Sequence, residues 1–359
     1  MNIALDATYG LGSELSGVGV YCSRIVEEMA RLGSGERFQL GYRLRRFWPA
    51  LRSGPPGPNC SRFLLEESAA WLSPRRADLF HGLNQRLPGI KFPRMVTTFH
   101  DLFMMTGEYS TPEFRERFTA LSRSAAERSD QIIAVSQFTA DQVVELLGYP
   151  RGRISVVHHG VDAMPAGRPG DAESLTKRYG ISGDFLLHVG AIQRRKNVER
   201  LVAAFERLDA RYTLVIAGTD GYGSEAIRAR IAASRARERI RVTGYVDRAT
   251  LQALYRAAAV LAFPSLDEGF GIPVIEAMSA GLPVVTSDRG AMREVSGDAA
   301  VLADPENTDA LHDGLVRALT DQELRERLHR DGRMRAAQFT WQRAAERTLA
   351  VYRKVADSS

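Results

Sequence analysis

Short apolar runs alternate with longer amphipathic stretches along almost the whole chain. Several of the runs are unbroken by polar residues, which is expected when helices cover both faces of a sheet. The alternation of strand and helix predicts an α/β fold with parallel, doubly wound sheets. The predicted strands are Asn2–Asp6, Met95–Phe99, Ile132–Val135, Ser155–Val157, Phe185–Val189, Tyr212–Ala217, Ile240–Thr243, Val260–Phe263, Pro283–Thr286 and Ala300–Leu302.

The sequence contains start signals for helices and one loop-like stretch that separates the predicted strands into two groups. Thr111-Pro112 reads as an N-cap followed by a first-turn proline, and Asn197 reads as the N-cap of a helix. The stretch Gly160–Gly170 is rich in glycine and proline and is interpreted as a linker. We therefore expect an N-terminal domain over residues 1–163 and a C-terminal domain over residues 171–338.

Composition narrows the class of protein. The 359 residues are 44% hydrophobic and 25% charged, which is typical of a globular protein with two domains. Two cysteines, Cys22 and Cys60, are too few for a disulfide framework, and no apolar run approaches the ~20 residues that span a bilayer. The N-terminus lacks the apolar segment of a signal peptide. These features predict a cytoplasmic protein.

The formal net charge of +5 suggests anionic partners, either phosphates or an anionic membrane surface. Neither a zinc spacing nor an aromatic and basic RNA motif is present, so nucleic acid is not an expected partner.

Two candidate sites lie in the N-terminal half. The glycine-rich run Gly10–Gly19 follows the first strand and leads into a helix, an arrangement that suits either a phosphate or a plain tight turn. His100-Asp101 follows the strand Met95–Phe99, where ligands of parallel sheets bind. It is either a ligand contact or a structural pair. His158 and His159 end another strand without an evident partner in the sequence.

A run of three cations, Arg194-Arg195-Lys196, precedes the predicted helix at Asn197. Cations at a helix N-terminus oppose the helix dipole, and a bound anion would relieve this. Arginine offers phosphate a bidentate fork, and lysine a point charge. The run is either a phosphate site or a solvated surface segment, and its position after a strand favours phosphate.

The segment Glu268–Glu276 has two carboxylates at its ends and a glycine-rich turn, Gly269-Phe270-Gly271, between them. It connects an apolar strand to a helix that begins near Pro273. Such a turn presents backbone N–H groups to an anion, and the two acids can accept hydrogen bonds from hydroxyls. A site for both phosphate and polyol is most simply a nucleotide-sugar site.

These segments, in this order, resemble the retaining glycosyltransferases of family 4, which have the GT-B fold of two Rossmann-like domains facing across a cleft. The resemblance covers nearly the whole chain, and its last block is the most specific. The matching segments are Gly17–Tyr21, Phe99–Asp101, Val135–Thr139, His159–Asp162, Gly190, Arg195–Asn197, Thr243–Val246 and Glu268–Val285.

The resemblance implies roles for individual residues. Arg195 and Lys196 would hold the donor diphosphate, Glu276 the ribose hydroxyls, and Glu268 and His100 the donor sugar. The remaining donor contacts would come from Gly17, Gly19, Gly190, Val246, Gly269, Phe270, Gly271 and Ile272. It also implies a final helix, within residues 339–359, that crosses back to the N-terminal domain. Ala191 and Arg194 depart from the family pattern, which leaves the part played by Arg194 open.

The reaction implied is transfer of a hexose from a nucleoside diphosphate to an acceptor hydroxyl, with retention of configuration and with no cofactor or metal. Same-face substitution is favoured over double displacement, because no carboxylate is evidently placed as a nucleophile. The Arg195–Asn197 run, followed later by the Glu268–Gly271 segment, is similar to that of bacterial polysaccharide and lipopolysaccharide mannosyl- and rhamnosyltransferases. We therefore favour GDP-mannose as donor, with UDP-sugars and dTDP-rhamnose as alternatives.

The expected acceptor is a growing, lipid-linked glycan at the inner face of the plasma membrane. Arginines of the N-terminal half either contact anionic lipid there or are ordinary surface charges: Arg43, Arg45, Arg46, Arg115 and Arg117. Two other classes stay open. They are a nucleotide-sugar 2-epimerase and an inactive scaffold homologue, and the joint presence of the predicted site residues argues against the second.

Overall fold

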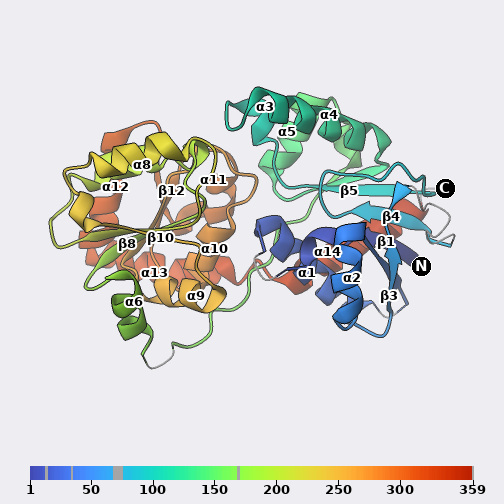
Figure 1. The fold of residues 1–359 in the computed structure, drawn as a ribbon, viewed down its shortest axis with the longest axis horizontal. Helices are drawn as coiled ribbons and strands as arrows, with labels where there is room; N and C mark the ends of the chain where they lie inside the picture. The colour runs from blue at the N-terminus through green and yellow to red at the C-terminus, as the bar shows by residue number, and fades with distance from the viewer. Residues whose placement is uncertain (13–14, 34, 68–75, 168–169, 358–359) are drawn as a thin grey trace. The chain divides into compact units, whose positions relative to one another are not determined.

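The computed structural model describes residues 1–12, 15–33, 35–67, 76–167 and 170–357. It divides into two compact units, each a sheet flanked by helices (Figure 1). The first comprises Met1–Gly160 and Phe339–Ser359, and the second comprises Val161–Gln338. The division falls at the start of the expected linker, and the C-terminal stretch from Phe339 belongs to the first unit. In the described ranges, no helix combines the length and apolarity needed to cross a membrane.

The first unit contains a seven-stranded sheet in the order β3-β2-β1-β4-β5-β6-β7, and all of its pairings are parallel. Leu5 of the central strand pairs with Leu40 on one side and His81 on the other. The strands are β1 (Asn2–Asp6), β2 (Arg37–Tyr42), β3 (Cys60–Leu64), β4 (Leu79–Gly82), β5 (Met95–Phe99), β6 (Gln131–Ala134) and β7 (Ile154–Val156). The helices are η1 (Thr8–Gly10), α1 (Gly17–Leu32), α2 (Leu44–Arg52), α3 (Phe103–Thr106), α4 (Pro112–Arg128), α5 (Gln137–Leu147), η3 (Arg151–Arg153) and α14 (Trp341–Asp357).

Three strands of this sheet, β2, β3 and β4, are missing from the sequence prediction. β3 is an edge strand, so Ser61 and Arg62 can be polar there without burying a charge. β4 is fully buried yet contains His81, whose ring nitrogens bond to Tyr352 Oη at 2.5 Å and Thr98 Oγ1 at 2.8 Å. A buried histidine with two hydrogen-bond partners breaks the apolar pattern without weakening the strand.

The C-terminal helix α14 packs against α1 in the core of the first unit. Trp341, Leu349 and Tyr352 share a buried cluster with Tyr21 and Ile25 of α1. The rings of Tyr21 and Trp341 lie 6.4 Å apart. The sequence from residue 341 thus completes the core of a sheet whose first strand begins at residue 2.

The second unit contains a six-stranded parallel sheet in the order β10-β9-β8-β11-β12-β13. Its strands are β8 (Phe185–Val189), β9 (Thr213–Ala217), β10 (Ile240–Gly244), β11 (Val260–Phe263), β12 (Val284–Ser287) and β13 (Val301–Ala303). Its helices are α6 (Asp171–Tyr179), η4 (Arg194–Lys196), α7 (Val198–Phe205), α8 (Ser224–Ala232), η5 (Arg237–Arg239), α9 (Arg248–Ala257), α10 (Ile272–Ser279), α11 (Gly290–Ser296), η6 (Gly297–Ala299), α12 (Thr308–Thr320) and α13 (Gln322–Ala336). The sequence predicts every one of these strands to within a residue or so. Both sheets bear out the α/β, doubly wound prediction.

Candidate functional site

Two loops of the second unit leave the same edge of the sheet. β8 and β11 are parallel neighbours, with Leu187 paired to Leu261. The loop after β8 therefore starts beside the loop after β11, because the carboxyl ends of parallel strands share one edge. This pairing brings the basic run and the acidic segment together across 72 positions of sequence.

Glu268 lies between the two cations. Lys196 Nζ is 2.5 Å from its Oε1, and Arg195 Nη1 is 2.8 Å from its Oε2. All three side chains are almost buried. Burial alone would raise the pKa of Glu268, but the charges of Arg195 and Lys196 outweigh it and lower the pKa to about 2. The carboxylate is therefore ionised at neutral pH, and the cluster has a net charge of one positive unit.

Asn197 fixes the shape of the basic loop. Its backbone is left-handed, with φ of 59°, and its side-chain amide donates to the carbonyls of Pro264 at 3.0 Å and Pro305 at 2.7 Å. Asn197 is the N-cap residue of α7, as predicted, but its side chain makes no capping hydrogen bond, and its amide ties the loops after β11 and β13 instead. The cations before it form the 3-10 turn η4, in which Arg195 and Lys196 are buried and Arg194 is exposed.

The loop glycines are required by close contacts. Gly190 has φ of 142°, and a Cβ there would lie 3.1 Å from Lys196 Cε. Gly271 has φ of 93°, and a Cβ there would lie 2.3 Å from Met292 Cε. Both positions favour glycine through backbone conformation and space. The packing of Lys196 and Met292 accounts for these glycines without a ligand.

Glu276 lies in α10, at the end of the same segment. Tyr255 of α9 donates a hydrogen bond from its hydroxyl to Glu276 Oε2 at 3.0 Å. Burial raises the pKa of Glu276, while the bond from Tyr255 opposes this. Pro273 stands in the first turn of α10 as predicted, and among the described residues no side chain caps that turn. Sequence reasoning missed Tyr255, because an aromatic residue on an amphipathic helix looks like any core position.

The other predicted donor contacts lie around this edge. Gly269 and Phe270 are buried in the loop after β11, and Ile272 begins α10. Val246 is half-buried in the short loop between β10 and α9. β10 is the edge strand two places from β8, so Val246 stands at the carboxyl end of the same sheet. Their contacts with a donor stay predictions.

His100, in the first unit, has a protein partner at each ring nitrogen. Its Nε2 lies 2.9 Å from the Leu83 carbonyl oxygen, and its Nδ1 lies 3.4 Å from His159 Nε2. The two imidazoles stack with their centroids 5.3 Å apart. Burial lowers the pKa of His100 to about 4, so it is neutral at pH 7. His159, which has no evident partner in the sequence, is therefore paired with His100.

Gly17 and Gly19 lie in the first turn of α1. Ser16 caps this helix by accepting a bond from the Gly19 N–H at 3.3 Å. A Cβ on Gly19 would lie 2.9 Å from the Tyr9 carbonyl oxygen, so internal packing requires a glycine there. Gly17 is exposed.

The described ranges contain no group of three or more His, Cys, Asp or Glu side chains arranged to hold a metal ion.

Family models match both halves of the chain. Residues 15–164 match the model described as Glycosyltransferase Family 4, and residues 175–335 match Glycosyl transferases group 1. The O-antigen chain mannosyltransferase B of Escherichia coli is 31% identical over 312 residues, which are 84% of this chain and 81% of that protein.

Solved structures share the fold over the whole chain. The sucrose-phosphate synthase of Thermosynechococcus elongatus matches with a TM-score of 0.80 and 20% identity, and covers 100% of both chains. Anabaena Alr3699/HepE in complex with UDP and glucose matches with a TM-score of 0.77 and 17% identity, over 99% of this chain and 100% of that one. The sequence relationship and the two parallel-sheet units together show that the chain is a glycosyltransferase, a member of family 4 with the GT-B fold.

Proposed function

We propose that the protein is a retaining, metal-independent hexosyltransferase that transfers mannose from GDP-mannose to a hydroxyl of a growing bacterial glycan. The observation that carries the nucleotide-sugar site is the buried cluster of Arg195, Lys196 and Glu268, with Glu276 on the helix that follows. The similarity to an O-antigen chain mannosyltransferase supports the choice of mannose.

The diphosphate of the donor is assigned to Arg195 and Lys196. Their charges lie together at the carboxyl end of β8, and Glu268 balances one of the two. The net positive charge of these three side chains and the N-terminal turn of α10 form a fixed electrostatic environment for a departing diphosphate. Metal independence is proposed because these cations can stabilise that charge themselves.

The ribose is assigned to Glu276. Its Oε2 accepts from Tyr255, and this bond orients the carboxylate. The side chain is only partly buried, so hydroxyls of a ribose have access to it. A carboxylate that accepts two hydroxyl bonds is a common way to hold a vicinal diol.

Same-face substitution is the proposed route to retention. In a double displacement, a carboxylate attacks the anomeric carbon. Glu268 is poorly suited to that role, because both of its oxygens are ion-paired and its pKa is lowered to about 2. A carboxylate so stabilised is a weak nucleophile. The leaving phosphate would then accept the proton of the acceptor hydroxyl.

The acceptor is proposed to be a lipid-linked glycan, and the enzyme to work in the cytoplasm, peripherally at the inner face of the plasma membrane. UDP-sugars and dTDP-rhamnose remain the alternative donors.

The donor assignment is tested by thermal shift against GDP, UDP, dTDP and their sugars. We expect GDP-mannose to raise the melting temperature most, because only a ligand that binds the native state tightly stabilises it. A larger shift with a UDP- or dTDP-sugar would mean that this sugar nucleotide, and not GDP-mannose, is the donor. Absence of any shift would contradict the nucleotide-sugar site and favour an inactive homologue.

The reaction is tested with the donor so identified and a glycan acceptor, with and without excess chelator. We expect an α-configured donor to give an α-linked product, and the rate to survive chelation. An inverted product, or a loss of activity that added metal restores, would contradict the mechanism. A C2-epimerised nucleotide sugar formed without acceptor would identify an epimerase instead.

A further inference from the structure

The segment around α2 is strongly basic and carries no opposite charge. Residues 43–59 contain Arg43, Arg45, Arg46 and Arg52 and not one Asp or Glu. Arg43 is already engaged, since its Nη2 lies 3.7 Å from Asp6 Oδ2. The other three arginines are exposed.

The same helix exposes large apolar side chains. Leu44 is 55% exposed, Trp48 is 65% exposed and Leu51 is 46% exposed. Positions four and seven residues after Leu44 lie on one face of a helix, so the three side chains form a single stripe. Exposure of three large apolar groups on a nine-residue helix is unusual for a surface in contact with water alone.

The stripe is separate from the face that α2 buries. Ala50 is fully buried, and Phe47 packs against the core of the first unit. These two positions anchor the helix against β2 and β3, which it also contacts (Figure 1). The helix therefore has an inward apolar side for the fold and an outward apolar stripe that the fold does not use.

Arg45 and Arg52 border the outward stripe. At about 100° per residue, both fall within about 60° of Trp48, whereas Arg46 falls about 160° from it, away from the stripe. The carboxylate of Glu66 accepts the Leu44 N–H at 2.9 Å and so caps the N-terminus of the helix. We define the α2 surface as Leu44, Arg45, Arg46, Trp48, Leu51 and Arg52.

Building on the proposed function at the membrane face, we propose that the α2 surface docks the enzyme on an anionic membrane. The combination of an apolar stripe, a tryptophan and flanking arginines is that of a helix lying in the plane of a bilayer interface. At roughly 13 Å the helix is far too short to span the bilayer, but it is long enough to lie along it. Protein interfaces also favour tryptophan and arginine, so an acidic protein is the alternative outcome of the vesicle test.

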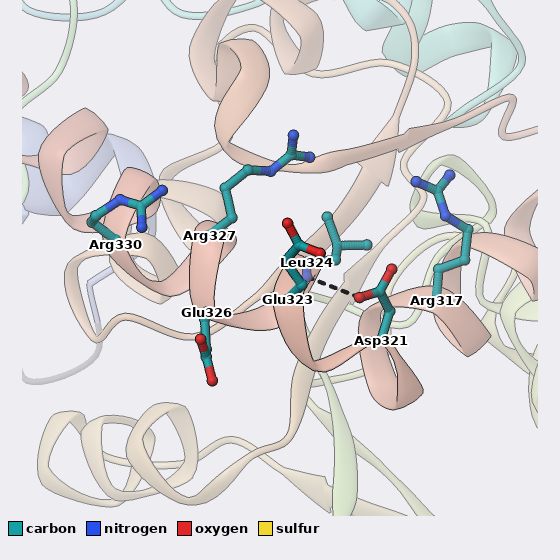
Figure 2. A pocket seen from close by; sticks show the side chains of 7 residues that line it. All are labelled: Arg317, Asp321, Glu323, Leu324, Glu326, Arg327 and Arg330. Atoms are coloured by element: carbon teal, nitrogen blue, oxygen red, sulfur yellow. Dashed lines mark hydrogen bonds between the residues drawn. The ribbon is translucent and has the colours of Figure 1, made fainter.

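A second arginine-rich surface provides a matched control. Arg317, Arg327 and Arg330, on α12 and α13 of the other unit, border a cavity together with carboxylates (Figure 2). Those carboxylates belong to Asp321, Glu323 and Glu326. Three arginines and three carboxylates should have no net attraction to an anionic membrane. These arginines therefore equal the exposed arginines of α2 in number but, unlike them, lie beside acids.

The test is sedimentation of the full chain with vesicles of phosphatidylcholine alone, or with about one third phosphatidylglycerol. We expect the wild type to bind only the anionic vesicles, and the binding to weaken at high salt. Replacing Arg45, Arg46 and Arg52 together by Gln should reduce partitioning about 100-fold, because each arginine near an anionic surface contributes about fivefold. Trp48→Ala should reduce it about tenfold.

The control variant replaces Arg317, Arg327 and Arg330 by Gln and should bind as the wild type does. An equal loss in this control would mean that net charge, and not the α2 surface, drives binding. If wild type fails to bind anionic vesicles at low salt, the membrane proposal is wrong, and an acidic protein remains as the occupant.

Tryptophan emission gives an independent readout. Trp48 should move from water into the interface, so vesicles should shift the emission of the wild type to shorter wavelength. In Trp48→Phe, vesicle binding should persist while the shift is lost; a shift that persists would place the contact elsewhere. None of these variants touches the nucleotide-sugar site, so nucleoside diphosphate binding should be unchanged. Vesicle binding and donor binding can therefore fail separately.

Discussion

Lys196 Nζ lies 2.5 Å from Glu268 Oε1, so a cation assigned to the donor is paired with an acid of the protein itself. Burying the ammonium group of Lys196 without an opposite charge would cost free energy, and the pair with Glu268 offsets that cost. Glu268 also neutralises one of the two positive charges that an incoming diphosphate would meet. The charge that a ligand meets at this site is therefore that of Arg195, Lys196 and Glu268 together.

Lys196→Ala is expected to weaken binding of GDP and of inorganic pyrophosphate alike, by about 10- to 100-fold, because a hydrogen bond to a charged group contributes that much. Isothermal calorimetry with both ligands measures this. Arg194→Ala is the matched control: Arg194 precedes the pair in sequence but is exposed, and its variant should retain both affinities. Unchanged affinities in Lys196→Ala would remove Lys196 from the diphosphate site, and a loss in Arg194→Ala as well would add Arg194 to it.

Glu276→Ala is expected to separate the ribose from the phosphates. Binding of GDP should weaken about tenfold, while binding of pyrophosphate, which has no ribose, should stay as in the wild type. Tyr255→Phe removes only the hydroxyl that orients Glu276 and should give a smaller effect in the same direction. If Glu276→Ala weakens pyrophosphate as much as GDP, then Glu276 does not act through the ribose.

The acid sensitivity of the second unit should depend on Glu268. Its pKa is lowered from 4.5 to about 2, so its ion pairs contribute stability that is fully present above pH 4.5 and is lost as the pH falls toward 2. Glu268→Gln removes the negative charge that balances two buried cations and should cost about 3 kcal/mol or more at pH 7. The free energies of unfolding of the wild type and Glu268→Gln, measured with denaturant, should converge as the pH falls from 4.5 to 2.

Glu206 of the same unit also has a pKa lowered to about 2, chiefly by its hydrogen bond with Arg230. Wild type alone therefore cannot assign the acid transition to Glu268, and the comparison with the Gln variant is the informative measurement. A difference that is constant over this range of pH would mean that the ion pairs do not titrate as inferred.

The sequence predicts the second sheet well because its strands are buried on both faces and read as continuous apolar runs. Which loops meet depends on strand order, which the apolar pattern does not give, because β8 and β11 are neighbours in the sheet and not in the sequence. The sequence could not predict β4, whose buried His81 depends on Tyr352, a residue 271 positions away. Long-range partners of this kind leave no local pattern.

The same limit applies at the candidate site. Tyr255 and Asn197 act through side-chain bonds to residues distant in sequence, and neither differs locally from an ordinary helix position or an ordinary cap. For His100, the position after β5 predicts a ligand contact. The structure adds bonds to Leu83 and His159, which the sequence does not indicate and which give it a structural role.

Gly160→Ala should destabilise the first unit by displacing α14. A Cβ at Gly160 would lie 2.2 Å from the backbone N of Trp341, where the helix begins, and backbone cannot yield as a flexible side chain can. We expect a loss of about 2 kcal/mol or more, the usual cost of overpacking a core. Gly152→Ala is the matched control, because in the described part of the chain no atom beyond its immediate neighbours lies within 4 Å of such a Cβ. Thermal unfolding of both variants measures the difference, and equal stability would mean that α14 adjusts freely against the sheet.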